Sequence, residues 1–171
     1  MKITPVMERF ILHWGEMGSR WGVNRTVSQI HALLYLSEEP QTAEAIAEML
    51  EVARSNVSTS LRELQGWGLV KIVHVRGDRR DHFEAHHDVR EIFRVVVEER
   101  KKREIDPTLT VLRSCSTEVG NETPKAIRER MQNTLEFMEQ LTGVYDEVQK
   151  LSDANLFAWL KTGMKARKLM S

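Results

Sequence analysis

A chain of 171 residues with 41% hydrophobic side chains can bury one sizeable core, or one small domain with an extension. Lys plus Arg and Asp plus Glu number 25 each, so the net charge indicates neither an acidic nor a basic partner. A single cysteine excludes an intrachain disulfide framework, and no apolar run approaches the roughly 20 residues that span a bilayer. We therefore expect a cytoplasmic protein without a membrane segment.

The first 50 residues have the pattern of three short helices. A first helix is predicted to begin near Pro5 and to end within residues 14–22, where three glycines occur. Thr26 and Gln29 have capping-box spacing and predict the start of a second helix, which carries apolar residues inward. Thr42 is the predicted cap of a third, short helix. These helices precede the most informative segment of the sequence.

That segment reads "ARSNVSTSLREL" from position 53. Val57, Leu61 and Leu64 recur at helical spacing, whereas the positions between them hold short polar side chains and arginine, although Glu and Lys are better helix formers. A helix that enters the major groove of DNA needs one packing face and one face of small donors and acceptors. The candidate DNA contacts on this helix are Arg54, Ser55, Asn56, Ser58, Thr59 and Arg62.

The two ends of this helix carry their own signals. Glu51 stands in the preceding turn, where helix-turn-helix motifs often have glycine, and this difference indicates another turn conformation. The helix is expected to end at Gly66 or Gly68, because glycine readily takes the left-handed conformation that closes a helix.

A β-hairpin is predicted directly after this helix. "LVKIVHV" is rich in β-branched residues, "HFEA" follows it, and Gly77 and Asp78 are the expected turn residues. Arg76, Arg79 and Arg80 cluster at the tip. A tip of this kind can lie along the DNA backbone and place an arginine in the minor groove, so these three arginines are further candidate contacts.

The remainder of the chain is predicted to be helical. Asp88 caps a long helix that Pro107 should interrupt or kink, and Thr123 with Pro124 opens a second long helix. That helix has a heptad-like seam, and a shorter helix within residues 156–160 follows it. The seam consists of Met131, Met138, Leu141, Tyr145 and Val148.

This order of elements predicts a mainly α fold, a winged helix-turn-helix with a small β-hairpin wing and dimerisation helices at both ends. We divide the chain into an N-terminal helix (1–23), a winged helix-turn-helix domain (24–87) and a helical dimerisation region (88–171).

Residues 42–87 resemble the DNA-binding core of MarR-type transcriptional regulators, and "GDRRDHFEA" together with the quoted helix is similar to the GbsR-like branch. The segment Asp78-Arg79-Arg80 resembles the family's Asp-x-Arg wing motif, in which the acid steadies a DNA-contacting arginine. The resemblance implies a homodimer that binds palindromic promoter DNA, and we expect a repressor. It further implies an effector of the choline or betaine type. The alternative is a winged-helix module that binds protein without sequence-specific DNA binding.

Aromatic residues near the N-terminus provide candidates for effector binding. Trp14 and Trp21, with Trp67 and Phe10 nearby, could form a cage for a quaternary ammonium solute, because aromatic faces attract cations. For any one of these residues, packing in the core is the alternative.

Other kinds of site have weaker signals. His74, His82, His86 and His87 lie close together in the sequence and leave a metal site open, although no Cys pair or helical His-x3-His spacing supports one. Cys115 is interpreted as a packed residue. No phosphate-binding loop or nucleophile signature is present, so we expect no enzymatic activity, no cofactor and no assigned metal ligand.

Overall fold

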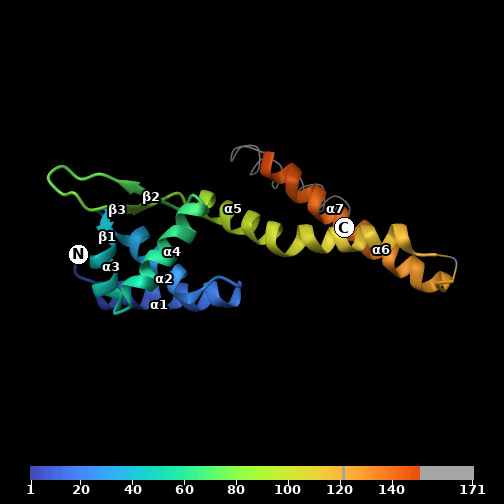
Figure 1. Cartoon of the computed structure of the whole chain (residues 1–171), viewed down its shortest axis with the longest axis horizontal. Coiled ribbons are helices and arrows are strands. Elements are labelled where there is room, and N and C mark those ends of the chain that lie inside the picture. Colours follow the sequence, from blue (N-terminus) through green and yellow to red (C-terminus); the bar gives the residue numbers. More distant parts are fainter. Residues whose placement is uncertain (121, 151–171) are drawn as a thin grey trace, which may run out of the picture. The chain divides into compact units, whose positions relative to one another are not determined.

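The computed structural model describes residues 1–120 and 122–150. The closing helix predicted within residues 156–160 lies outside the described residues. Residues 1–99 and the residues from 100 onward form two compact units, which are described separately. Figure 1 shows the elements in chain order. They are α1 (Pro5–Arg20), α2 (Arg25–Leu36), β1 (Gln41–Thr42), α3 (Ala43–Leu50), α4 (Arg54–Gly66), β2 (Val70–Val73), β3 (His82–Ala85), α5 (Val89–Arg100), a π-helical segment (Lys101–Ile105), α6 (Asp106–Glu118) and α7 (Lys125–Lys150).

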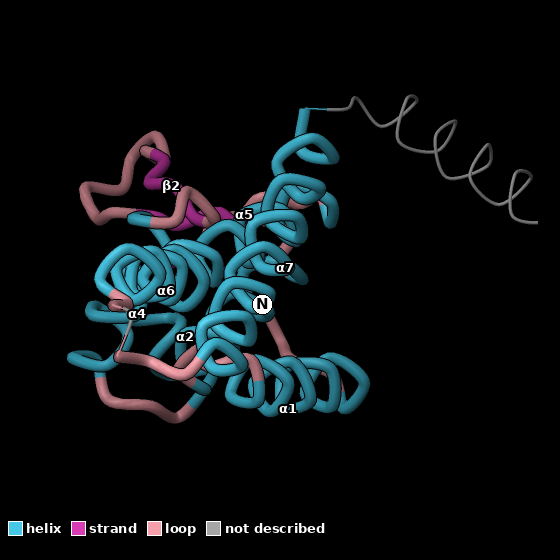
Figure 2. Tube along the Cα trace, turned by 90° about the vertical axis from the view of Figure 1, so that its right-hand side faces the viewer, coloured by secondary structure: helices cyan, strands magenta, loops and turns pink. Residues whose placement is uncertain are grey.

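The first unit is a winged helix-turn-helix, as the sequence predicts. Its small antiparallel sheet has the strand order β1-β3-β2, and β2 and β3 form the predicted hairpin. The loop of this hairpin projects away from the helices (Figure 2). The two-residue strand β1 was not predicted; Gln41 pairs with Phe83 and Thr42 with His82.

The core of the first unit lies between its helices and the sheet. The inward positions of α2, α3 and α4 meet there, together with the residue that precedes β2. Burying these side chains removes apolar surface from water and is the main stabilising contribution to the fold. The fully buried side chains are Val27, Ile30, Leu33, Leu34, Ile46, Val57, Leu61, Leu64 and Leu69.

Two predicted helix caps are confirmed and one is wrong. The Thr42 hydroxyl accepts a hydrogen bond from the Ala45 N–H at 3.2 Å, and Asp88 Oδ1 accepts one from the Arg90 N–H at 2.9 Å. The cap of α2 is Asn24, whose Oδ1 accepts from the Thr26 N–H at 2.8 Å, so Thr26 lies inside the helix. Asn and Thr are both good capping residues, so residue type alone did not distinguish them.

The second unit pairs two antiparallel helices. The predicted interruption near Pro107 is confirmed, because α5 ends at Arg100 and the π-helical segment precedes α6. Leu135 of α7 and Leu109 of α6 are buried. Arg113 on α6 donates a hydrogen bond from Nε to Glu139 Oε1 on α7 at 2.8 Å.

The heptad seam of α7 is only partly confirmed. Met131, Met138, Tyr145 and Val148 are partly buried, but Leu141 lies on the exposed face and Thr142 takes the inward position beside it. The inward face is centred on Leu135, which shifts the stripe relative to the predicted one. Among the described residues, no helix is both long and apolar enough to cross a lipid bilayer.

Candidate nucleic-acid interface and aromatic pocket

The turn between α3 and α4 holds the helix-turn-helix together. Glu51 adopts the left-handed conformation with a φ of 53°, and the Val52 N–H donates to the Ala47 carbonyl at 3.1 Å. The predicted change of turn conformation is therefore wrong, because Glu51 takes the backbone conformation that favours glycine. This conformation costs a residue with a side chain roughly 1 kcal/mol, and the packing of the two helices maintains it.

The helix α4 separates its two faces as predicted. Val57, Leu61 and Leu64 are buried against the core. The predicted contact residues lie on the other side, where Ser58 is half-buried and the rest are exposed: Arg54, Ser55, Asn56, Thr59 and Arg62. The helix ends at Gly66, and the Leu69 N–H donates to the Leu64 carbonyl at 2.9 Å across Gly68, which has a φ of 72°.

The start of α4 suits an anion. Ala53 is its N-cap and forms no side-chain hydrogen bond, and no acidic residue occurs in the first turn. Backbone N–H groups at such an end attract phosphate.

Arg54 is held by a residue that the sequence analysis missed. Its Nε donates to Glu44 Oε1 on α3 at 2.9 Å, and its Nη1 donates to the Ser58 hydroxyl. Two hydrogen bonds lower the pKa of the Glu44 carboxyl, first the one from its own backbone N–H and then the one from the Arg54 side chain. The carboxyl therefore stays charged near neutral pH. Glu44 thus orients Arg54 along the exposed surface of α4. Glu44 is an acidic residue in the first turn of α3, and this is the sequence feature from which its contact with Arg54 could have been inferred.

The hairpin tip is organised around Asp78. Arg80 donates from its Nε to Asp78 Oδ1 at 3.0 Å and from its backbone N–H to the same oxygen at 3.0 Å. Hydrogen bonds from Arg80 hold the pKa of Asp78 well below its usual range. The acid and the arginine of the motif are therefore in direct contact. Within the described part of the chain, Arg76 and Arg79 pair with no acid.

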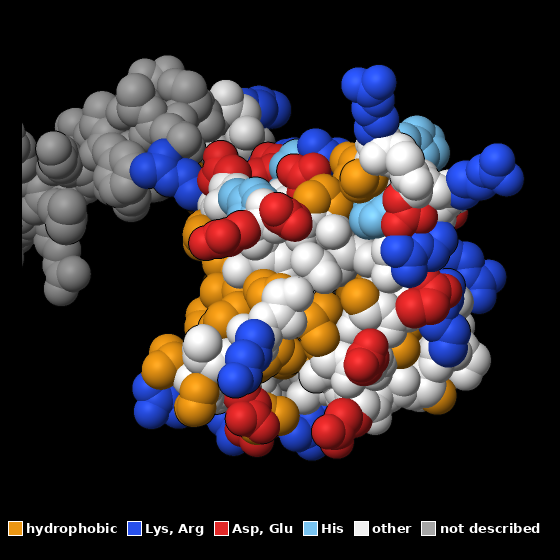
Figure 3. Space-filling view, turned by 90° about the vertical axis from the view of Figure 1, so that its left-hand side faces the viewer, with side chains coloured by type: hydrophobic (Ala, Val, Ile, Leu, Met, Phe, Trp, Pro, Cys, Tyr) orange, Lys and Arg blue, Asp and Glu red, His pale blue; other side chains and the backbone are white. Residues whose placement is uncertain are grey.

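The turn itself differs from the prediction. The Asp78 N–H donates to the Val75 carbonyl at 3.1 Å, so the central residues are Arg76 and Gly77 in place of Gly77 and Asp78. Gly77 has a φ of 88°, which suits glycine at the third position of a type II turn. This turn places Arg76 at the tip. Figure 3 looks onto the hairpin end of the molecule, where Lys and Arg side chains protrude along one edge with Asp and Glu side chains between them.

The four histidines do not form a metal site in the described residues, where no group of three or more His, Cys, Asp or Glu could hold an ion. His82 is buried, and its Nδ1 lies 3.0 Å from the Arg80 carbonyl oxygen. It thereby supports the hairpin loop. The ring of His87 lies beside that of Tyr35, with 5.9 Å between the ring centroids.

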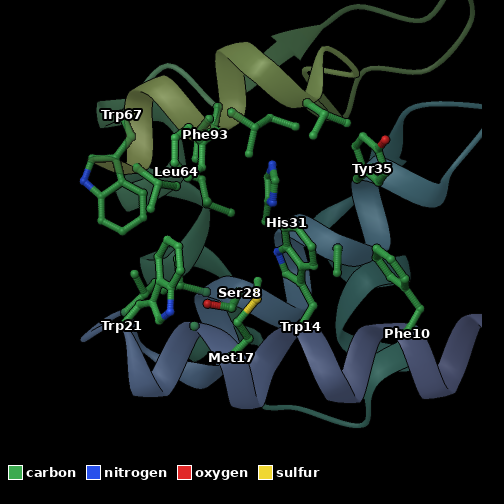
Figure 4. A pocket seen from close by; sticks show the side chains of 18 residues that line it. Phe10, Trp14, Met17, Trp21, Ser28, His31, Tyr35, Leu64, Trp67 and Phe93 are labelled. Atoms are coloured by element: carbon green, nitrogen blue, oxygen red, sulfur yellow. The ribbon is translucent and has the colours of Figure 1, made fainter. Parts of the chain in front are cut away.

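The aromatic residues surround a pocket of about 410 Å³ between α1, α2, α5 and the end of α4 (Figure 4). Trp14 and Trp21 both line it, and so do Trp67 and Phe10. Phe10 stacks on Trp14 with ring centroids 5.4 Å apart. The pocket walls further include residues that the sequence analysis did not assign to a site: Met17, His31, Tyr35 and Phe93.

Close packing of α1 on α2 forms the floor of this pocket. A Cβ atom at Gly18 would lie 1.9 Å from the Ser28 hydroxyl oxygen and 2.7 Å from its Cβ, so only glycine fits. Gly18 was interpreted as a residue that weakens the first helix. Its position in the fold gives it a second role, because it allows the two helices to approach each other.

Comparison with known proteins identifies the fold that presents this surface. A model of the MarR family matches residues 21–81. The likeness to this family is confined to that part of the chain. The matched segment contains the helix-turn-helix and ends with the arginine-rich loop of the wing. The MarR family consists of transcriptional regulators, which agrees with the expectation drawn from the sequence.

Individual relatives extend the likeness beyond residues 21–81. The transcriptional repressor GbsR of Bacillus subtilis is 21% identical over 139 residues, which cover 78% of this chain and 77% of GbsR. A crystal structure of a transcriptional regulator has a TM-score of 0.63 at 19% identity and covers 84% of this chain and 95% of its own. That likeness shows the fold. The complex of Staphylococcus aureus MepR with DNA has a TM-score of only 0.39 at 19% identity, covering 64% of this chain and 97% of its own, which is too distant for a comparison of interfaces.

Proposed function

We propose that this protein is a homodimeric transcriptional regulator that binds palindromic promoter DNA sequence-specifically and acts as a repressor. The exposed polar face of α4, opposite a fully buried apolar face, is the observation that carries the proposal. The proposed contacts are Arg54, Ser55, Asn56, Ser58, Thr59 and Arg62 on α4, and Arg76, Arg79 and Arg80 on the wing. A small solute in the pocket beside Trp14 and Trp21 would modulate this activity. We further propose that the protein acts in the cytoplasm and has no enzymatic activity.

The proposed division of labour follows the sequence boundaries. Residues 24–87 would bind DNA, and the helices within 1–23 and 88–171 would hold two copies together. A palindromic site requires twofold symmetry in the protein, because each half-site is then contacted in the same way.

Base reading by Asn56 tests the proposal most directly. Its amide could pair bidentately with adenine, and each such pairing is worth about 1–3 kcal/mol of discrimination. Operators would first be selected from genomic fragments with the purified protein. We expect Asn56→Ala to lose preference at one position of each half-site while it melts like the parent, because Asn56 is exposed and Ala is the better helix former.

The control is Glu63→Ala, farther along the same helix and outside the proposed contact set. An Asn56→Ala protein that discriminates operators as well as the parent would remove Asn56 from the set. If neither protein binds duplex DNA in a salt-dependent manner, the alternative of a protein-binding module would replace the proposal.

The wing is expected to contribute affinity for DNA with little discrimination between DNA sequences. Arg80→Ala should weaken specific and non-specific binding alike and reduce the slope of log affinity against log salt by about one, because one phosphate contact is lost. Lys71→Ala, on the exposed side of β2 and paired with Glu84, serves as the control for a lost positive charge. An Arg80→Ala protein with the parental slope would show that the wing stays off the phosphates.

An apolar stripe on α7 is the proposed contact between the two copies. Phe137, Leu141 and Val144 are 63%, 53% and 57% exposed and follow one another at helical spacing. We expect Phe137→Glu with Leu141→Glu to give monomers in sedimentation velocity and to weaken operator binding. Gln132→Glu with Gly143→Glu adds the same charge at exposed positions away from the stripe and should leave the dimer intact. If the Phe137→Glu, Leu141→Glu variant remains dimeric, the contact between the two copies lies elsewhere.

A further inference from the structure

Glu44 brings a negative charge to the surface that is proposed to bind DNA. It stands in the first turn of α3 and pairs with Arg54 at the start of α4. The side chains of Glu44 and Arg54 are 58% and 47% exposed, and an ion pair in such contact with water adds little to stability. A carboxylate at this place also repels the phosphates of DNA. Neither stability nor simple affinity for DNA therefore accounts for the pair.

The charge of Glu44 reaches both elements that are proposed to contact DNA. Its Oε1 accepts a hydrogen bond from Arg54 Nε at 2.9 Å. The pKa of Arg80 on the wing is raised, mainly by the hydrogen bond with Asp78 and to a smaller extent by the charge of Glu44. The loop of the wing keeps a positive charge, because its three arginines outnumber its two aspartates. At the start of α4, by contrast, the charges of Arg54 and Glu44 cancel.

Arg54 has N–H groups left after its contacts within the protein. A guanidinium carries five N–H donors. Glu44 accepts from Nε and the Ser58 hydroxyl accepts from Nη1, so both terminal nitrogens, Nη1 and Nη2, keep a donor for a ligand. Two neighbouring donors of this kind match the O6 and N7 acceptors of guanine in the major groove, and they also match two oxygens of a phosphate.

The Glu44 carboxylate distinguishes between these two ligands. A phosphate on Arg54 would stand close to that carboxylate, and the repulsion between the two anions offsets part of its attraction to the guanidinium. The edge of guanine offers the same two acceptors without a net charge.

We propose that Arg54 reads a guanine in each half-site through Nη1 and Nη2, and that Glu44 is its positioning residue. Glu44 holds the guanidinium on the exposed side of α4 and disfavours contacts of this side chain with the phosphates of non-specific DNA. Such base reading rests on the proposed function, since it requires that α4 enters the major groove of an operator.

Replacement of guanine by 7-deazaguanine tests the contact, because it removes the N7 acceptor and leaves base pairing intact. Each guanine of a selected operator half-site is replaced in turn, and binding by the parent and by Arg54→Ala is measured. We expect one position in each half-site where the replacement weakens binding by the parent about tenfold, as the loss of one hydrogen bond to a charged group gives. Binding by Arg54→Ala should not respond to the replacement at that position.

Two substitutions of Glu44 separate its hydrogen bond from its charge. Glu44→Gln keeps an acceptor for Arg54 Nε and should keep the sensitivity to 7-deazaguanine, whereas Glu44→Ala should lose most of it. Both remove the negative charge, so both should bind non-specific duplex DNA more tightly, with a slope of log affinity against log salt that is steeper by about one. Glu48→Gln removes an exposed charge one turn farther along α3 and should leave sensitivity and slope unchanged. Thermal melting shows that each variant is folded.

Equal effects of 7-deazaguanine on the parent and on Arg54→Ala at every guanine would overturn the proposal. A reduced salt slope of Arg54→Ala with unchanged sequence preference would assign Arg54 to a phosphate and would overturn it as well. Full sensitivity of Glu44→Ala would show that Glu44 does not position Arg54. All three outcomes leave the proposed function standing. A parent protein that binds no duplex DNA in a salt-dependent manner would instead contradict the proposed function, and base reading by Arg54 with it.

Discussion

Val57→Asp is expected to unfold the winged-helix unit, whereas Thr59→Asp, two residues away, is expected to leave it folded. Val57 is completely buried between α4 and the core, so the substitution removes its apolar burial and places a carboxylate where no partner exists. An unpaired buried charge costs about 3–5 kcal/mol, which approaches the whole net stability of a small domain.

Thr59 lies on the exposed face of the same helix, and surface substitutions usually change stability by no more than about 0.5 kcal/mol. Its new carboxylate would instead repel the phosphates of bound DNA. Thermal melting and operator titration of the two proteins separate the two faces of α4. A Val57→Asp protein that melts like the parent would mean that α4 does not pack as described, and a Thr59→Asp protein with parental affinity would mean that this face stays off the DNA.

Acid is expected to destabilise the protein through His31. Burial lowers its pKa from about 6.5 in an unfolded chain to about 4 in the folded protein, so the unfolded chain binds more protons between these values. The stabilising effect of the neutral ring is therefore complete above pH 6.5 and is lost as the pH falls towards 4. The shift corresponds to about 3 kcal/mol in the free energy of unfolding.

Urea unfolding at pH 7.5 and at pH 4 measures this contribution. The parent should lose about 3 kcal/mol more between the two pH values than His31→Leu, which cannot be protonated there. Asp78, Glu44 and Glu91 have lowered pKa values and remain in both proteins, so their contribution cancels in the comparison. Equal losses for the two proteins would show that His31 is protonated as readily when folded as when unfolded.

The helix-turn-helix could be predicted closely because its signals are local. The period of Val57, Leu61 and Leu64 requires one buried face, and the Thr42 hydroxyl needs only the backbone of its own helix to act as a cap. The hairpin followed from β-branched residues on both sides of a glycine-containing loop. Its turn was misplaced by one residue, because several neighbouring residues can occupy the central positions of a turn.

The seam of α7 was harder to predict because the helix carries two apolar stripes. Leu141 fits a heptad, yet the antiparallel packing of α6 and α7 buries Leu135 and leaves Leu141 exposed. A helix with apolar residues on more than one face does not indicate which face its neighbour covers. Glu51 is a similar case, because a glutamate side chain does not indicate that its backbone adopts the left-handed conformation.

By itself, the sequence determined the order of the helices and the hairpin, the two faces of α4 and the arginine-rich wing, since each depends on residues close together in the chain. Only the tertiary structure decided the pocket, whose walls come from residues between Phe10 and Val96 on four helices and in the loops beside them. It also decided the environment of His31, which in the sequence is one polar residue in an apolar helix. Whether such a side chain is satisfied depends on what distant segments place beside it, and that is fixed only when the helices pack.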